Sequence, residues 1–374
     1  MKKKLLFNIH YLEIGGAETS LIGLLHSLNP DEYKVDLMLN DSRGELMKYI
    51  PDWVNVINVP KAYAMIERPI IEVLKKGFWK VAFTRLWAKY KFSRYQKIKK
   101  PIEGSAIFGF IGKYVTPVLP GLSHLGEYDI AISYLTPHNI VLEKIKAKKK
   151  VCWIHTDYSS IDVSREIELP IWSGYDKIIS ISDKVTETFC SVFPELEYKV
   201  EKIEPILSKS FIQKRSEEFI PEDMTRIEDE ILFLTIGRYC YQKNLESIPG
   251  ICKSLLKSGF NVKWFIIGYG RTDEYIRKSI KAQGMEKKVV LLGKKENPYP
   301  YIKKCDFYIQ PSRYEGNSIT VKEAILLNKP IIITNYPTSS SQFNNYDKGY
   351  IVSSQINQCI SDIIEILSQN YNKK

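Results

Sequence analysis

Residues 231–244 have the sequence ILFLTIGRYCYQKN, an apolar run of strand length that ends in a turn with one glycine and two cations. Similar apolar runs recur at 262–267, 289–293, 307–310 and 331–333, and helix-forming stretches lie between them. Strand, loop and helix thus alternate with a period of about 30 residues, which is typical of a parallel sheet with helices on both faces. We therefore predict a doubly wound α/β domain in this part of the chain.

The N-terminal half follows the same order. Residues 5–9 are a short apolar run, a loop follows at 13–18, and residues 17–28 have apolar side chains at helical spacing. The chain has 374 residues, 44% of them apolar, which suits two domains of about 180 residues each. We predict a second α/β domain here.

The domain boundary is predicted just ahead of the polar and acidic stretch at 216–223. We assign residues 1–205 to an N-terminal domain and 206–354 to a C-terminal domain. Residues 355–374 contain isoleucines at helical spacing and are predicted to form a terminal amphipathic helix.

Two glutamates, Glu315 and Glu323, stand eight positions apart in the C-terminal domain. A helix is expected to begin near Ser318, so the first carboxylate precedes it and the second lies inside it. Eight residues span roughly 12 Å of helix, enough to address hydroxyls at both ends of one extended ligand. The helix start between them, with Gly316, Asn317 and Ser318, is expected to attract phosphate. The pattern predicts a nucleotide diphosphate sugar site, and the alternative is two solvated glutamates.

Arg238 and Lys243 lie in the turn that follows the first strand of this domain. Cleaving a sugar from a diphosphate builds negative charge on the leaving group, which fixed cations and amide dipoles stabilise. A guanidinium grips phosphate oxygens bidentately, and a lysine acts as a point charge. We predict diphosphate binding here, the alternative being two surface cations in a chain of net charge +11.

Glycines follow several predicted strands, namely Gly15, Gly16, Gly268, Gly270 and Gly293. Glycines at the carboxyl ends of α/β strands lie where ligands bind, although most such residues merely turn the chain. We include all five in the predicted ligand site. Gly15 and Gly16 do not form the Gly-x-Gly-x-x-Gly pattern, so no nicotinamide or flavin cofactor is predicted.

Together these elements resemble the family 4 glycosyltransferases of GT-B fold, in which a Glu-x7-Glu element holds the donor sugar and the ribose. The resemblance covers residues 230–350 well and the N-terminal half thinly. It implies that Glu315 positions the donor sugar, Glu323 holds the ribose, and Arg238 and Lys243 bind the diphosphate. It also implies two Rossmann-like domains facing across a cleft, the first binding the acceptor and the second the nucleotide sugar. The terminal helix is expected to cross back onto the first domain.

The same resemblance implies a retaining, metal-independent hexosyltransferase with no cofactor besides its nucleotide diphosphate sugar donor. It places His155 near the transferred sugar, although a histidine at a strand end more often caps backbone groups. Asp157 is expected to orient His155 or to bind the acceptor. Asn317 and Ser318 replace Phe-Gly of many relatives and are expected to alter which sugar fits. Asn244 replaces a frequent glycine, a mild change because asparagine tolerates the left-handed conformation.

Residues 75–100 contain ten basic residues and no acidic one. On a helical wheel the large apolar side chains share one stripe, formed by Trp79, Phe83, Leu86, Trp87 and Tyr90. Such a helix is typical of attachment to anionic lipid. One alternative is a core-facing helix with a cationic outer face. Nucleic acid is not expected, because nothing else in the chain resembles a nucleic-acid module.

We therefore predict an enzyme that moves a sugar from a nucleotide diphosphate sugar to a glycan or lipid-linked acceptor in surface polysaccharide biosynthesis. It is expected to be cytoplasmic and peripheral on the inner face of the membrane, since no apolar run reaches 18 residues and no secretory signal is evident. The six cysteines are scattered without metal-ligand spacing and are expected to be reduced. The alternative is a non-catalytic basic adaptor of similar shape that binds membranes or nucleic acid.

Overall fold

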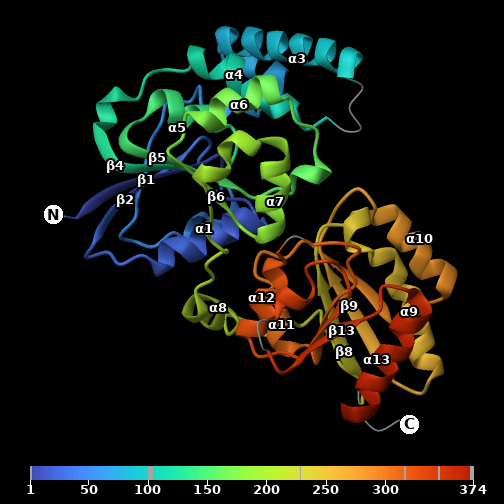
Figure 1. Cartoon of the computed structure of the whole chain (residues 1–374). Coiled ribbons are helices and arrows are strands. Elements are labelled where there is room, and N and C mark those ends of the chain that lie inside the picture. The colour runs from blue at the N-terminus through green and yellow to red at the C-terminus, as the bar shows by residue number, and fades with distance from the viewer. Residues whose placement is uncertain (1, 100–103, 228, 316, 344–345, 371–374) are drawn as a thin grey trace. The chain divides into compact units, whose positions relative to one another are not determined.

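The computed structural model describes residues 2–99, 104–227, 229–315, 317–343 and 346–370. The chain divides into two compact units, Met1–Ile206 and Leu207–Lys374. Each unit is built around its own parallel sheet (Figure 1). The predicted pair of α/β domains is confirmed, and the division falls after residue 206, where the sequence predicts it after residue 205.

The first unit contains a parallel sheet flanked by helices. Its strands are β1 (Lys3–Ile9), β2 (Tyr33–Leu39), β3 (Asn55–Ile57), β4 (Glu127–Ser133), β5 (Lys146–Ile154), β6 (Lys177–Ser180) and β7 (Val200–Lys202). Its helices are α1 (Gly16–Ser27), α2 (Ile70–Lys75), α3 (Trp79–Lys99), α4 (Ile107–Val115), α5 (Asn139–Lys144), α6 (Arg165–Ser173) and α7 (Asp183–Val192). Among the described residues the strand order is β3-β2-β1-β4-β5-β6-β7.

The second unit has the same architecture. Its strands are β8 (Ile231–Ile236), β9 (Val262–Ile267), β10 (Val289–Gly293), β11 (Phe307–Gln310), β12 (Ile331–Thr334) and β13 (Gly349–Val352). Its helices are α8 (Lys209–Arg215), α9 (Ile248–Lys257), α10 (Asp273–Gln283), α11 (Tyr299–Lys304), α12 (Ile319–Leu326) and α13 (Ile356–Asn370). Every residue of β8, β9, β11 and β12 is buried, as expected of strands covered on both faces.

The strand order of the second sheet fixes where a ligand is expected. The order is β10-β9-β8-β11-β12-β13, so β8 has β9 on one side and β11 on the other. After β8 the chain adds β9 and β10 on one side of this strand, and it later adds β11, β12 and β13 on the other side. In open α/β sheets, ligands bind at the carboxyl ends of strands at such a switch point. The loops that follow β8 and β11 contain Arg238, Lys243 and Glu315.

Helix α13 packs within the second unit. The sequence predicts an amphipathic helix here, and the structure has one at Ile356–Asn370. Its apolar side chains pack into the core of the second unit, where Cys359, Ile363 and Leu367 are buried beside side chains of α9 and β9. The apolar face of α13 is thus used within the second unit, and the expected crossing onto the first domain stays a prediction.

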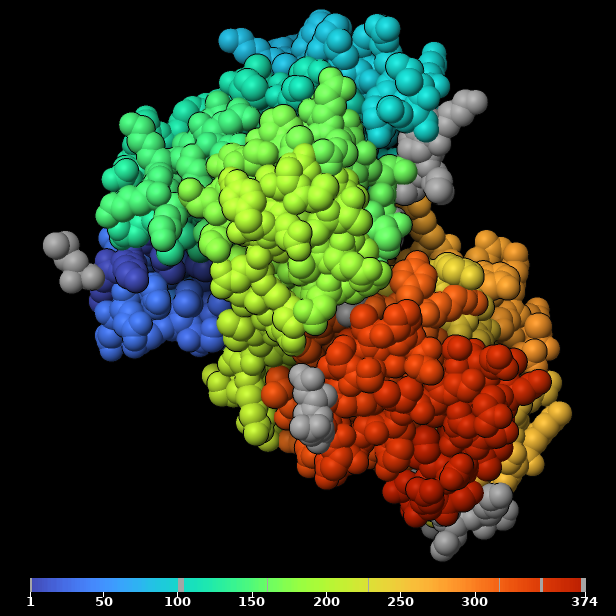
Figure 2. Space-filling view, in the orientation of Figure 1, coloured from blue at the N-terminus to red at the C-terminus, as the bar shows by residue number. Residues whose placement is uncertain are grey.

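Helix α3 lies against α4 at one side of the first unit (Figure 1). Ala88 and Phe92 face inward and form a small cluster with Phe110 of α4 and Ile167 of α6. The side chains of the predicted aromatic stripe are exposed, and α3 forms part of the molecular surface in Figure 2. The alternative that this stripe faces the core is therefore wrong. Lys100, the last residue of the predicted basic segment, lies outside the described residues.

Candidate functional site

A lysine and a glutamate from two neighbouring strand ends form an ion pair in the second unit. Lys243 Nζ lies 2.7 Å from Glu315 Oε1, and the two side chains are 15% and 7% exposed. The other two N–H donors of this ammonium group have no acceptor among the described residues. The pair thus brings together two residues that the sequence assigned to one ligand, and the ammonium group retains donors for an anion.

The carboxylate of Glu315 is held by three further donors. Its Oε1 accepts hydrogen bonds from Ser312 Oγ at 2.6 Å and Gln310 Nε2 at 3.1 Å, and its Oε2 accepts one from Gln242 Nε2 at 3.2 Å. The hydroxyl of Thr338 donates to its backbone carbonyl at 2.7 Å. These contacts come from three loops, so the carboxylate is fixed before any ligand arrives.

Glu323 lies inside α12 and is 3% exposed. Its Oε1 accepts a hydrogen bond from the Tyr299 hydroxyl at 2.9 Å, and its Oε2 accepts none from the residues that the structure describes. Burial raises the pKa of this carboxyl to about 7, although Tyr299 and the positive charge of Arg215 act in the opposite direction. The side chain therefore has one oxygen left for a ligand hydroxyl, and its charge changes near neutral pH.

A buried tyrosine and glutamine lie between the two carboxylates. The Tyr308 hydroxyl donates to Gln310 Oε1 at 2.6 Å, and the amide of the same glutamine donates to Glu315. Burial raises the pKa of Tyr308, and the negative charges of Glu323 and Glu315 raise it further. The two glutamates are thus electrostatic neighbours of one buried hydroxyl, which agrees with their assignment to a single site.

The start of α12 differs in one respect from the predicted phosphate-binding site. The backbone N–H of Ser318, the residue preceding the helix, donates to Gln342 Oε1 at 3.0 Å. A phosphate would have to displace this side chain to use that N–H group. Asn317 is half-buried beside it. Gly316 lies outside the described residues, so its predicted close approach to the ligand stays a prediction.

Arg238 follows β8 and is exposed. Its guanidinium has no ion pair or hydrogen bond with any described residue. A cation that is not neutralised by the protein attracts anions from solution. The structure therefore provides an arginine available to phosphate at the end of the same strand whose loop contains Lys243.

The glycines at the strand ends have a packing role that the sequence did not show. A Cβ atom on Gly268 would lie 1.9 Å from the carbonyl oxygen of Gly237, and one on Gly270 would lie 2.4 Å from that of Tyr239. Both glycines have positive φ, at 152° and 158°. They therefore allow the loop after β9 to touch the loop after β8. Gly293 also has positive φ, at 70°, with open space around it.

The glycine loop of the first unit precedes α1. Gly15 immediately precedes the helix in extended conformation, and Gly16 is its first residue. The Glu18 carboxylate lies over Gly15, because a Cβ atom there would be 2.2 Å from Glu18 Oε2. His10 is close to Glu18, and the hydrogen bond to this glutamate and the charge of Glu67 raise the pKa of His10 although burial lowers it. The space above Gly15 is therefore filled by the Glu18 side chain.

His155 follows β5 and lines a cavity of about 300 Å³ in the first unit. Its Nε2 is buried and has no hydrogen-bond partner among the described residues. Burial lowers its pKa to about 4, so the ring is neutral at pH 7. Asp157 caps the next turn, since its carboxylate accepts hydrogen bonds from the Ser159 N–H at 2.9 Å and hydroxyl at 2.7 Å. The carboxylate is thus engaged in local capping.

Sequence reasoning missed the polar side chains that hold the predicted residues in place, namely Gln242, Gln310, Ser312, Thr338 and Gln342. Gln310 offered a signal, because it is a polar residue that ends an otherwise apolar strand. Gln342 offered none, since it reaches the start of α12 from a different loop. The left-handed conformation predicted for Asn244 is confirmed, with φ at 54°.

The second unit, which contains these residues, is similar to known proteins. Residues 216–374 match the family model described as Glycosyl transferases group 1. An uncharacterized glycosyltransferase of Methanocaldococcus jannaschii is 28% identical over 149 residues, which cover 40% of this chain and 37% of that protein. The amylovoran biosynthesis glycosyltransferase AmsD of Erwinia amylovora is 22% identical over 237 residues, which cover 62% of this chain and 65% of that protein. These alignments span less than two thirds of either relative.

A solved structure extends the similarity to both units. A variant of Staphylococcus aureus TarM, in complex with Fondaparinux, alpha-GlcNAc-glycerol and UDP, matches 98% of this chain and 93% of its own. The TM-score is 0.64 at 13% sequence identity, a similarity of fold. The chain therefore has the GT-B fold. Residues 216–374, less than half of the chain, match the glycosyl transferases group 1 model, and the resemblance stated from the sequence is confirmed.

Proposed function

We propose that this chain is a retaining glycosyltransferase that takes its sugar from a nucleotide diphosphate sugar. The observation that supports this most is the Lys243–Glu315 ion pair of 2.7 Å at the switch point of the second sheet. It lies in the domain that matches the glycosyl transferases group 1 family. The relatives support a role in polysaccharide biosynthesis, since AmsD acts in amylovoran biosynthesis.

In the proposed reaction, each polar residue of the second unit has one task. Arg238 and Lys243 bind the diphosphate, Glu315 positions the donor sugar, and Glu323 accepts hydrogen bonds from the ribose. The bond between the anomeric carbon and the diphosphate oxygen breaks, and the acceptor hydroxyl bonds to that carbon on the same face. The hydroxyl proton passes to the departing phosphate oxygen. Fixed cations stabilise the charge of the leaving group, so we propose that the hexosyl transfer needs no metal.

Donor binding tests the proposal. We expect one of the UDP-, GDP- and CDP-sugars to bind in isothermal titration calorimetry with a Kd in the range from about 1 μM to 1 mM, typical of enzyme substrates. The affinity should be the same with EDTA and with added divalent metal. A product whose anomeric configuration equals that of the donor, seen by NMR, supports retention. If no nucleotide sugar binds, the non-catalytic adaptor is the better description.

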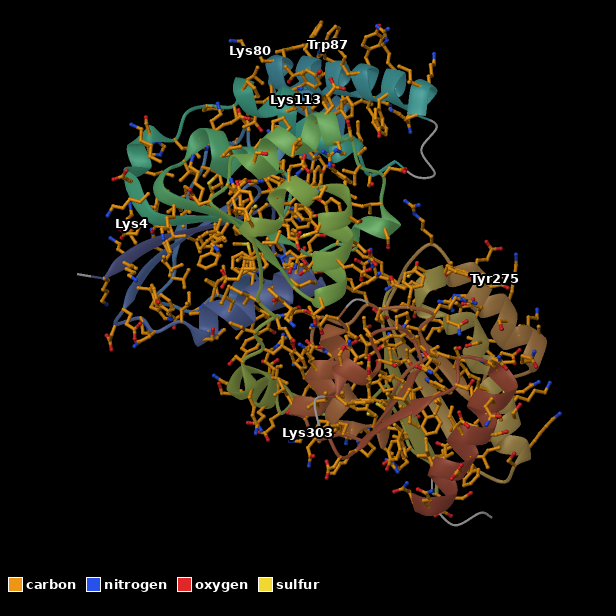
Figure 3. All side chains as sticks on the ribbon, viewed as in Figure 1. Lys4, Lys80, Trp87, Lys113, Tyr275 and Lys303 are labelled. Atoms are coloured by element: carbon orange, nitrogen blue, oxygen red, sulfur yellow. The ribbon has the colours of Figure 1, made fainter. Side chains whose placement is uncertain are left out.

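We further propose that α3 attaches the protein to an anionic membrane surface. Trp79, Phe83 and Trp87 are 63%, 74% and 49% exposed on one face of this helix. The segment around them contains only basic charges. Figure 3 shows Trp87 and Lys80 on the outer side of α3. No helix in the described part of the chain is long and apolar enough to span a bilayer.

Replacing two of these aromatic side chains should weaken the attachment. The double variant F83A/W87A should reduce partitioning onto phosphatidylglycerol vesicles roughly 10- to 30-fold, because each aromatic side chain contributes about 1 kcal/mol when half inserted. Vesicle sedimentation measures this partitioning. The matched control is Tyr275→Ala, whose side chain is 61% exposed on α10. Equal partitioning of parent and double variant would contradict attachment through α3.

A further inference from the structure

Three helices of the second unit meet at Glu323. Helix α12 contains this residue, and α8 and α11 contact both α12 and each other (Figure 1). Helix α11 contributes Tyr299, whose hydroxyl donates to Glu323 Oε1 at 2.9 Å. Helix α8 contributes Arg215, whose positive charge acts on the same carboxyl. The carboxyl proposed for the ribose is thus bordered by side chains from two other helices.

Arg215 is buried against the ring of Tyr299. Its side chain is 3% exposed, and the centre of its guanidinium lies 5.2 Å from the centroid of that ring. The guanidinium also forms an ion pair of 3.7 Å with Glu218 and donates to the Glu296 carbonyl at 3.3 Å. A guanidinium remains charged inside proteins. A permanent positive charge therefore lies in the core beside the tyrosine that holds Glu323.

A buried asparagine fixes Arg215 and Tyr299 relative to each other. The side-chain amide of Asn297 donates to the backbone carbonyl of Arg215 and to Glu218 Oε2, both at 2.8 Å. Its side-chain oxygen accepts the backbone N–H of Tyr299 at 3.1 Å. Because these contacts form one buried network, the tyrosine hydroxyl and the guanidinium are held in position next to α12.

The surroundings of Glu323 oppose its negative charge, and the two residues offset part of this effect. Burial raises the pKa of Glu323 to about 7, while the hydrogen bond from Tyr299 and the charge of Arg215 lower it. Both contacts favour the charged form. Neighbouring hydroxyls of a ribose donate hydrogen bonds, so they bind a carboxylate better than a protonated acid. Removing either contact should leave fewer molecules ready to bind at pH 7.

The strands packed on α12 add no charge at this point. Strands β11 and β12 also contact the helix, and β12 has the sequence IIIT, without a titratable side chain. Strand β11 contributes Tyr308, whose pKa is raised by burial and by the charges of Glu323 and Glu315. All five histidines of the chain lie at or before residue 155, in the first unit. A change of donor binding between pH 6 and pH 8.5 should therefore report on Glu323.

We propose that Tyr299 and Arg215 are positioning residues that hold Glu323 in place and in its charged form for the ribose of the donor. This inference rests on the proposed function, because it concerns the same site. It extends that site to α8 and α11, which lie outside the loops that follow β8 and β11. Neither residue needs to contact the donor, since both act through Glu323.

Tyr299→Phe tests the inference, because it removes one hydroxyl and keeps the ring. Loss of a hydrogen bond to a charged group should move the midpoint of donor binding upward by about one pH unit. The ligand is the UDP-, GDP- or CDP-sugar that the parent binds. At pH 7 the variant should bind it about 5-fold more weakly than the parent, and at pH 8.5 the two should agree within about 2-fold.

Isothermal titration calorimetry from pH 6 to pH 8.5 measures this profile. A midpoint equal to that of the parent would overturn the inference. Weakening by the same factor at every pH would also overturn it, because it would show that Tyr299 supports only the packing of α11.

Variants of α8 provide the second arm. Arg215→Gln removes the charge and should move the midpoint in the same direction as Tyr299→Phe, and Arg215→Lys should move it part of the way back. Lys214→Gln is the matched control, since it removes an exposed cation at the preceding position of α8. Tyr301→Phe removes a hydroxyl of α11 that bonds to Asp223 instead. A shift in these controls as large as in Tyr299→Phe would overturn the inference. If Arg215→Gln does not fold, Tyr299→Phe decides.

Proton release gives a readout that packing alone does not change. The free parent should carry about half a proton on Glu323 at pH 7 and should release it when the donor binds. Tyr299→Phe should release nearly a whole proton at the same pH. Calorimetry in buffers of different ionisation enthalpy measures this number. Equal release by parent and variant would contradict the role of Tyr299.

The two proposals fail in different ways. The parent shows first whether any nucleotide sugar binds, and if none does, the proposed function fails. If the parent binds a donor and Tyr299→Phe has the same pH profile, the inference about Tyr299 and Arg215 is wrong and the proposed function stands.

Discussion

Lys243→Ala should lower kcat/KM for the donor roughly 100- to 1,000-fold, as loss of one charge-stabilising donor does in other active sites. The reason is the position of the ammonium group, which lies 2.7 Å from Glu315 and has two donors without an acceptor among the described residues. Its removal takes away a cation for the leaving diphosphate and leaves the buried Glu315 carboxylate without its counter-ion. Slow hydrolysis of the donor, with water as acceptor, measures the loss without knowledge of the natural acceptor.

A surface ion pair provides the matched control for this variant. Lys303 Nζ lies 2.9 Å from Glu217 Oε1, and both side chains are more than half exposed at 52% and 69%. Lys303→Ala should leave donor hydrolysis unchanged (Figure 3). Lys243→Arg restores the charge and should recover part of the activity. If Lys243→Ala, folded by circular dichroism, hydrolyses the donor as fast as the parent, the assignment of Lys243 to the diphosphate is wrong.

Glu323→Gln should weaken donor binding roughly 10- to 100-fold, because a hydrogen bond to a charged group contributes about 1.5–3 kcal/mol. The carboxylate Oε2 has no partner among the described residues and is available to the ribose. Since the pKa of Glu323 is raised to about 7, the parent should bind the donor more tightly at pH 8 than at pH 6. The Gln variant should show no such dependence. Calorimetry of donor binding at both pH values tests this expectation. The control is Glu274→Gln, an exposed residue of α10, which should leave donor binding unchanged.

The same carboxyl links stability to pH. A carboxyl whose pKa is higher in the folded than in the unfolded chain binds more protons when folded, so the free energy of unfolding falls as pH rises from about 4.5 to about 7. The shift corresponds to a contribution on the order of 3 kcal/mol, fully present below pH 4.5 and lost above pH 7. Glu323→Gln should therefore be more stable than the parent at pH 8. A lower melting temperature of the variant at that pH would contradict the buried, titrating state.

The sequence predicted the sheets better than the side-chain contacts. Strands such as β8 and β11 are recognisable because burial on both faces requires continuous apolar runs. The residues between Glu315 and Glu323 predicted a helix start, but they did not show which side chains contact the two carboxylates. The ion pair with Lys243 depends on two strands being neighbours, which is a property of the sheet order. Contacts of this kind join residues far apart in the chain.

The packing of the terminal helix is another property that the sequence alone does not fix. The spacing of isoleucines shows that α13 has one apolar face, but not which core receives it. The basic segment also has one apolar stripe, and the structure shows that this stripe is exposed. Val81, Ala88 and Phe92 of the same helix are buried.

The close passage of Gly268 by the Gly237 carbonyl has a consequence for how this chain tolerates change. Gly268, an uncharged residue, sets the path of the backbone next to Arg238. A methyl group at position 268 would push that backbone aside and displace the arginine, with every charged side chain still present. A sequence comparison that records only acids and bases would count such a chain as intact, although Arg238 had moved.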